Sequence, residues 1–133
     1  MSNNLATVQQ MYAAFGQGDV PTVLSLMPND VVLINAADPS KTPISGEFKG
    51  KEGAVQYFTI LGTTVQTTNF VASNFHEADN KVVNDILHEG VVVATGKPFS
   101  SQLTFTWTFN DKGEPIHWVG SGDFESLYAA SVN

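Results

Sequence analysis

The second half of the chain alternates apolar and polar residues in long runs that are separated by short turn segments. The runs cover Asn69–His76, Lys81–Thr95, Phe99–Asn110 and Ile116–Leu127. Side chains of a strand point alternately to the two faces of a sheet, so each run predicts a strand. Connections this short make neighbouring strands antiparallel. In the third run Leu103, Phe105 and Trp107 share one face, which predicts that this face of the sheet is covered.

The first half of the chain shows helical spacing instead. Helices are expected over residues near 5–15, 19–27 and 54–61, with a strand at Val31–Ala36 and a loop at Ala37–Gly50. Asp19 is the expected N-cap of the second helix, because Pro21 then lies in the first turn, where its missing N–H costs little. Helices followed by an antiparallel meander define an α+β fold, with three helices packed on one face of a curved sheet.

Composition excludes several classes of function. The chain has 133 residues, thirteen acidic against six basic, which gives a formal net charge of −7. Its basic residues are all scattered lysines, so neither a nucleic-acid-binding stripe nor an arginine clamp on a carboxylate or phosphate is expected. Cysteine is absent, and so is any apolar run long enough to span a membrane. We therefore expect one acidic, soluble, cytoplasmic domain over residues 1–133.

Several local motifs, in this order and spacing, resemble the nuclear transport factor 2-like superfamily and its SnoaL-like domains. The matching pieces are Tyr12-Ala13-Ala14-Phe15 with Gly18-Asp19, Asn29-Asp30-Val31-Val32, Gly50-Lys51-Glu52-Gly53-Ala54-Val55, Thr95-Gly96-Lys97, Asp111-Lys112-Gly113 and Asp123. The resemblance implies a cone-shaped α+β roll with an internal pocket. It also implies a homodimer, because members commonly pair through the sheet. The superfamily includes polyketide cyclases, ketosteroid isomerases and limonene-1,2-epoxide hydrolases, so the resemblance implies no single activity.

The resemblance carries over to individual residues only in part. Asn35 falls where ketosteroid isomerases have their aspartate base, and an amide cannot shuttle a proton. The epoxide hydrolase pattern fits better, since its first-strand asparagine matches Asn35 and its final-strand aspartate matches Asp123. That pattern's arginine and aspartate pair falls on Ile86 and His88. A final-strand aspartate of the SnoaL-like cyclases also points to Asp123.

Three residues are therefore the candidates for chemistry, each with a plainer alternative. Asp123 is the candidate general base, with Gly120 and Gly122 leaving space for a ligand, or else it caps a turn and faces water. His88 is the candidate acid or proton relay, or else a surface histidine beside Glu89. The third candidate, Asn35, is either an orienting hydrogen-bond donor or an amide that holds the following loop.

These residues lead to three hypotheses of function. The first is a cofactor-independent acid/base enzyme, of isomerase, cyclase, dehydratase or epoxide-hydrolase type, acting on a small apolar molecule. The second is a non-catalytic carrier or sensor of such a molecule, and the third is a dimerising association domain. The expected pocket lining, which core packing would equally explain, is Tyr12, Tyr57, Phe58, Phe105, Trp107 and Trp118. No spacing indicates a metal or a nucleotide cofactor.

Overall fold

A computed structural model describes residues 3–133 of the chain. Its elements, in order, are α1 (Asn4–Gly16), α2 (Val20–Ser25), β1 (Val32–Asn35), β2 (Gly46–Lys49), α3 (Gly50–Thr64), β3 (Val65–Ala78), β4 (Lys81–Val92), β5 (Pro98–Phe109), β6 (Pro115–Asp123) and α4 (Glu125–Ala130). The expected α+β architecture is confirmed. No helix of the described residues is long and apolar enough to cross a membrane.

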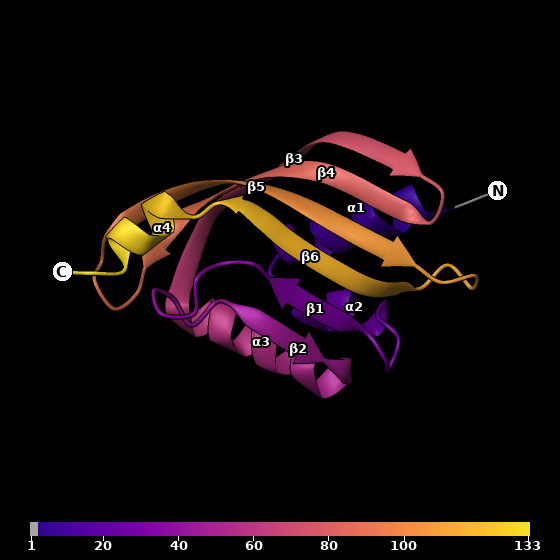
Figure 1. The fold of residues 1–133 in the computed structure, drawn as a ribbon, viewed down its shortest axis with the longest axis horizontal. Helices are drawn as coiled ribbons and strands as arrows, with labels where there is room; N and C mark the ends of the chain where they lie inside the picture. Colours follow the sequence, from indigo (N-terminus) through magenta and orange to yellow (C-terminus); the bar gives the residue numbers. More distant parts are fainter. Residues whose placement is uncertain (1–2) are drawn as a thin grey trace.

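The six strands form one curved, open sheet in the order β2-β1-β6-β5-β4-β3 (Figure 1). The four long strands β3 to β6 are antiparallel neighbours, as their short connections predict. β1 enters beside β6 in parallel, with Leu33 opposite Trp118 and Asn35 opposite Gly120. The parallel pairing brings Asn35, at the end of the first strand, next to the last strand, which carries the candidates Trp118 and Asp123.

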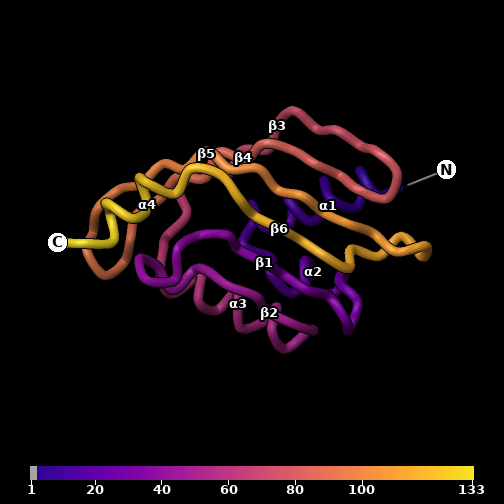
Figure 2. Tube along the Cα trace, in the orientation of Figure 1, coloured from indigo at the N-terminus to yellow at the C-terminus, as the bar shows by residue number. Residues whose placement is uncertain are grey.

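The helices α1 and α3 lie under the arch of the sheet, and the Cα trace in Figure 2 shows the same arrangement. α1 contacts β3 and β4, whereas α3 contacts β1, β2 and β3. The short helix α4 packs against β5 and β4 at the end of the molecule where the C-terminus lies. Sheet, α1, α3 and α4 therefore surround a common interior on several sides.

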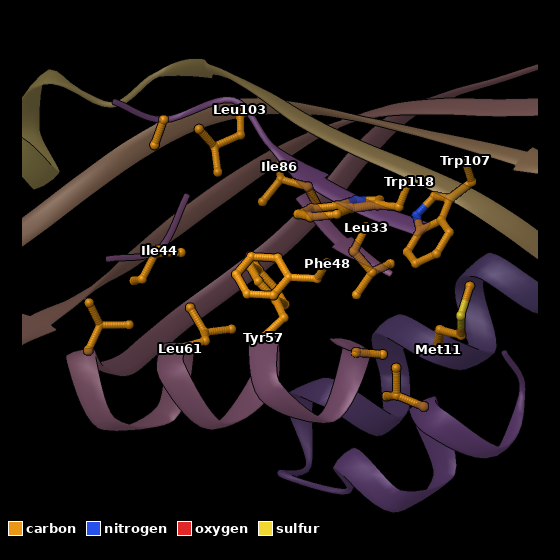
Figure 3. Close-up of a cluster of buried hydrophobic side chains, with 14 of the residues drawn as sticks. Met11, Leu33, Ile44, Phe48, Tyr57, Leu61, Ile86, Leu103, Trp107 and Trp118 are labelled. Atoms are coloured by element: carbon orange, nitrogen blue, oxygen red, sulfur yellow. The ribbon is translucent and has the colours of Figure 1, made fainter. Parts of the chain in front are cut away.

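The core fills the space between α3 and the sheet. Tyr57 and Leu61 rise from α3 toward Leu103 and Trp118, which descend from the sheet (Figure 3). The close packing explains Gly53, which weakens the helical pattern of α3 in the sequence. A Cβ atom at this position would lie 2.9 Å from the backbone carbonyl carbon of Phe48 on β2. The glycine is therefore needed for the approach of α3 to β2.

Asp19 caps the N-terminus of the second helix, α2, as expected. The Asp19 carboxylate accepts hydrogen bonds from the Thr22 N–H at 3.2 Å and the Thr22 hydroxyl at 2.6 Å, and Pro21 lies in the first turn. A capping bond of this kind satisfies a backbone donor that has no partner inside the helix.

Two expectations about the elements are wrong. The segment Ala37–Gly50 is not entirely a loop, because its last part forms β2, a four-residue strand of which only Phe48 is buried. The last strand does not reach Leu127, because it ends at Asp123 and α4 follows. Phe124, Leu127 and Ala130 are all buried at a spacing of three, which is the helical pattern that the strand assignment overlooked.

Candidate ligand-binding site

A cavity of about 80 Å³ lies between the helices and the concave face of the sheet. Residues from every helix and from β1, β3, β4, β5 and β6 contribute to its wall. The residues that line it are Met11, Tyr12, Phe15, Val23, Met27, Leu33, Asn35, Ile44, Tyr57, Phe58, Leu61, Phe70, His88, Ser101, Leu103, Phe105, Trp107, Trp118, Phe124 and Leu127. The cavity has about half the volume of an engineered apolar cavity of about 150 Å³ that holds benzene, so a ligand with a benzene-sized ring fits only if side chains of the wall move apart.

The wall of the cavity carries no charge at neutral pH. Among the described residues that line it there is no aspartate, glutamate or lysine. Burial lowers the pKa of His88 to about 4, and burial raises the pKa of Tyr57 to about 12 despite its bond from Asn35. The pKa of Tyr12 is raised further, again by burial. All three groups are therefore neutral at pH 7.

His88 points inward from β4, in step with Asn84 and Ile86, which are 1% and 2% exposed. Its ring packs edge-on against Phe99, with ring centres 5.1 Å apart, and against Phe70 at 6.1 Å. Its Nε2 atom lies 2.8 Å from the Thr67 hydroxyl on β3. The imidazole is therefore held in one orientation by apolar contacts on two sides and one hydrogen bond, rather than lying free on the surface.

Asn35 joins the end of β1 to α3. Its side-chain N–H donates to the Tyr57 hydroxyl at 3.2 Å, and its carbonyl oxygen accepts from the Ala37 N–H at 3.0 Å. The second bond holds the start of the following loop, as the structural alternative for Asn35 supposes. Because Tyr57 accepts from Asn35, its own hydroxyl proton can be donated toward the cavity.

A three-residue network fixes the wall between α1 and the sheet. The Tyr12 hydroxyl accepts from the Trp107 indole N–H at 3.0 Å and donates to the Asn84 carbonyl oxygen at 2.7 Å. The Asn84 amide in turn donates to the Asp85 carbonyl. The Tyr12 hydroxyl thus both donates and accepts a hydrogen bond within the chain, which suits a structural role in the wall.

Two polar atoms in the cavity wall have no hydrogen-bond partner. Within the described part of the chain these are the Ser101 hydroxyl and the Trp118 indole N–H, on residues that are 2% and 4% exposed. The Trp118 ring lies over Gly120, where a Cβ atom would come within 2.6 Å of it. Gly120 therefore makes room for Trp118, and not for a ligand as the sequence suggested.

The structure places Asp123 outside the cavity. Its side chain is exposed at the end of β6, where a carboxylate oxygen accepts from the Glu125 N–H at 3.0 Å at the start of α4. Gly122 opens no space beside it, since a Cβ atom there would meet the backbone of β5 at 2.6 Å. The expectation of an inward carboxylate is corrected, because β6 ends at this residue instead of continuing.

The other candidates come together as a set. The cavity is bordered by His88, by Asn35 and by all six expected lining residues, which are Tyr12, Tyr57, Phe58, Phe105, Trp107 and Trp118. Their part in ligand binding stays a prediction. Among the lining residues that were not expected from the sequence are Ser101, Phe124 and Leu127. For Ser101 the sequence did contain an indication, because the alternation of β5 places it on the same face of the sheet as Leu103.

A shallower groove of about 490 Å³ adjoins the cavity between α1, α3 and the start of β3. Phe15, Phe58, Leu61 and Phe70 line both spaces, so these four side chains separate the cavity from the groove. Thr67 lines the groove and holds His88, which lines the cavity.

In residues 3–133 no group of three or more His, Asp or Glu side chains is arranged to hold a metal ion. The expectation that the protein needs neither a metal nor a cofactor stays a prediction.

Comparison with known proteins gives a family and a fold. The sequence pattern of the SnoaL-like domain matches residues 8–116. No curated protein matches the sequence. An NTF2-like protein of unknown function from Burkholderia pseudomallei is similar over 100% of both chains, with a TM-score of 0.89 and 21% identity.

Several of the similar structures contain small molecules, and two of them match nearly the whole chain. TerC co-crystallised with polyporic acid has a TM-score of 0.86 and 21% identity over 98% of each chain. RV0760c of Mycobacterium tuberculosis, in complex with estradiol-17beta-hemisuccinate, has a TM-score of 0.77 and 18% identity over 95% of this chain and 98% of its own. At this level of identity, both show a shared fold.

Proposed function

The chain belongs to the SnoaL-like domain family, and from this we propose that it binds a small, uncharged, largely apolar molecule in the cavity under its sheet. The observation that carries the proposal is the uncharged wall: His88, Tyr12 and Tyr57 are neutral at pH 7, and no other lining residue in the described part of the chain is ionisable. A charged ligand would lose its hydration there without gaining a counter-charge, which is costly. Polyporic acid with TerC and estradiol-17beta-hemisuccinate with RV0760c support a small organic molecule as the ligand.

A comparison of neutral and charged aromatic probes tests this function. Toluene is expected to bind in the cavity at pH 7, whereas benzoate and benzylammonium, of similar shape, are expected to bind at least about tenfold more weakly because each buries an unpaired charge. Protein NMR titrations give the affinities and the site, since the methyl signals of Ile44 and Leu103 report on the wall. Equal binding of benzoate, or binding of none of the three, would contradict the proposal.

A matched pair of variants locates the binding. Leu103→Phe adds volume to the cavity wall and is expected to weaken toluene binding. Leu87→Phe makes the same change on the opposite face of β4, away from the cavity, and is expected to leave binding unchanged. Loss of binding in both variants would place the probe elsewhere.

Proton transfer on the bound molecule is the second candidate function. His88 supports it, because an imidazole held by Thr67 borders the cavity beside groups that can orient a substrate, Tyr57 and Asn35. A pKa of about 4 keeps this imidazole unprotonated at neutral pH and makes it a weak base. We therefore place binding ahead of catalysis, and we give Asp123 no part in either.

We further infer that two copies of the chain pair through the outer face of the sheet. Thr104, Thr106 and Thr108 line this face beside Val119 and Ser121 of β6, and they are only partly exposed within one chain. Sedimentation at tens of micromolar is expected to give twice the 14.3 kDa of one chain. A monomer under these conditions would contradict the pairing. The cytoplasmic location also stays a prediction.

A further inference from the structure

The Ser101 hydroxyl is a polar group buried without a partner in an otherwise ordered wall. Ser101 is 2% exposed, and its oxygen makes no hydrogen bond in the described structure. Most buried polar groups in native proteins are hydrogen-bonded, and each exception needs an explanation. Core packing alone does not supply one, because alanine would fill the same position without an unsatisfied hydroxyl.

His88 is the polar neighbour of this hydroxyl. Ser101 on β5 lies directly opposite His88 on β4 in the antiparallel register. Side chains of such a pair stand on the same face of the sheet, with Cβ atoms about 5 Å apart. Both residues line the cavity, yet no hydrogen bond joins them. Phe99 and Phe70 surround the imidazole, and its Nε2 atom is occupied by Thr67.

Their arrangement defines the group that fits between them. A serine hydroxyl can donate and accept, and a neutral imidazole offers one donor and one acceptor nitrogen. A hydroxyl or carbonyl oxygen of a ligand can pair with such groups without bringing a charge into the cavity. We propose that Ser101 and His88 form a polar subsite that binds one uncharged oxygen group of an otherwise apolar ligand. This inference rests on the proposed binding function and names the chemical class of its ligand.

Phenol and toluene test the subsite, because they are nearly equal in shape and differ in one hydroxyl group. In the parent protein both are expected to bind. Ser101→Ala is expected to weaken phenol binding about three- to tenfold, the usual contribution of one neutral hydrogen bond, and to leave toluene binding unchanged or slightly tighter. NMR titration of both probes against both proteins gives the four dissociation constants.

Two further variants serve as controls. Ser73→Ala removes an exposed serine hydroxyl from β3 and is expected to change neither affinity. Trp118→Phe removes the other unpartnered donor of the wall. If phenol loses affinity relative to toluene in Trp118→Phe and not in Ser101→Ala, the oxygen group binds at Trp118 and the proposal is overturned.

Thermal unfolding gives an independent readout. Because Ser101→Ala removes a hydroxyl with no partner, its melting temperature without ligand is expected to equal or exceed that of the parent. A clearly lower melting temperature would show that the hydroxyl serves the fold, and it would overturn the subsite. If toluene binds and phenol affinity is unchanged in Ser101→Ala, the subsite is rejected and the binding function stands. If neither phenol nor toluene binds the parent protein, both the subsite and the proposed binding function are rejected.

Discussion

Tyr12→Phe is expected to lower the free energy of unfolding by about 2–6 kcal/mol, although it removes a single oxygen atom. That oxygen accepts from the Trp107 indole and donates to Asn84. Without it, a donor on a residue 5% exposed and an acceptor on a residue 1% exposed both lose their partner. Each unsatisfied buried group costs about 1–3 kcal/mol. Urea unfolding followed by tryptophan fluorescence measures the loss.

Tyr57→Phe is the matched control for this prediction. The Tyr57 hydroxyl also faces the cavity, but in the described structure it takes part in one hydrogen bond, which it accepts from Asn35 at 3.2 Å. Its removal leaves one group unsatisfied instead of two, so the loss is expected to be about half as large. If Tyr12→Phe stays within about 0.5 kcal/mol of the parent, the network does not hold α1 on the sheet in the way we describe.

Removal of a hydroxyl group from the cavity wall is therefore expected to change stability in opposite directions at different residues. Loss of the Tyr12 hydroxyl breaks two bonds that the folded chain makes by itself, whereas loss of the Ser101 hydroxyl breaks none. Groups satisfied within the chain serve the fold, and a buried group left unsatisfied is available to a ligand. This difference separates the wall of the cavity from the proposed subsite.

The overall fold was predictable because its patterns are long. Alternation over nine to fourteen residues and short connections leave few arrangements for β3 to β6. Short elements gave weaker indications: β2 has four residues, and α4 has six. Asp123 stands at the junction of a strand and a helix, where a change of period by one residue moves a side chain from the cavity to solvent.

The sequence did not allow us to predict which residues of neighbouring strands lie opposite each other in the site. His88 and Ser101 are thirteen residues apart in the chain and come together through the register of β4 with β5. The Thr67 bond to His88 likewise depends on the register shift in β3 between Thr67 and Asn69. Alternation gives the face of a residue, but the register that selects its neighbours depends on turns and bulges.

The pH dependence of stability is expected to report on His88. Its pKa is about 4 in the folded chain and near the ordinary value of 6.5 when unfolded, because burial disfavours the charged form. Between these values the unfolded chain binds more protons, so the stability of the folded chain falls as the pH falls below 6.5. From pH 7 to pH 5 this loss amounts to about 2 kcal/mol, and it continues toward pH 4.

Comparison with His88→Gln isolates this contribution from that of the acidic residues. Glutamine removes the titrating group and can still bond the Thr67 hydroxyl, so the loss between pH 7 and pH 5 is expected to be about 2 kcal/mol smaller in the variant. His76→Gln, at an exposed position on β3, is expected to keep the loss of the parent. Urea unfolding at intervals of half a pH unit measures all three proteins. If the parent and His88→Gln lose stability equally, His88 is not buried as a neutral imidazole. The uncharged wall on which the proposed ligand class depends would then be incorrect.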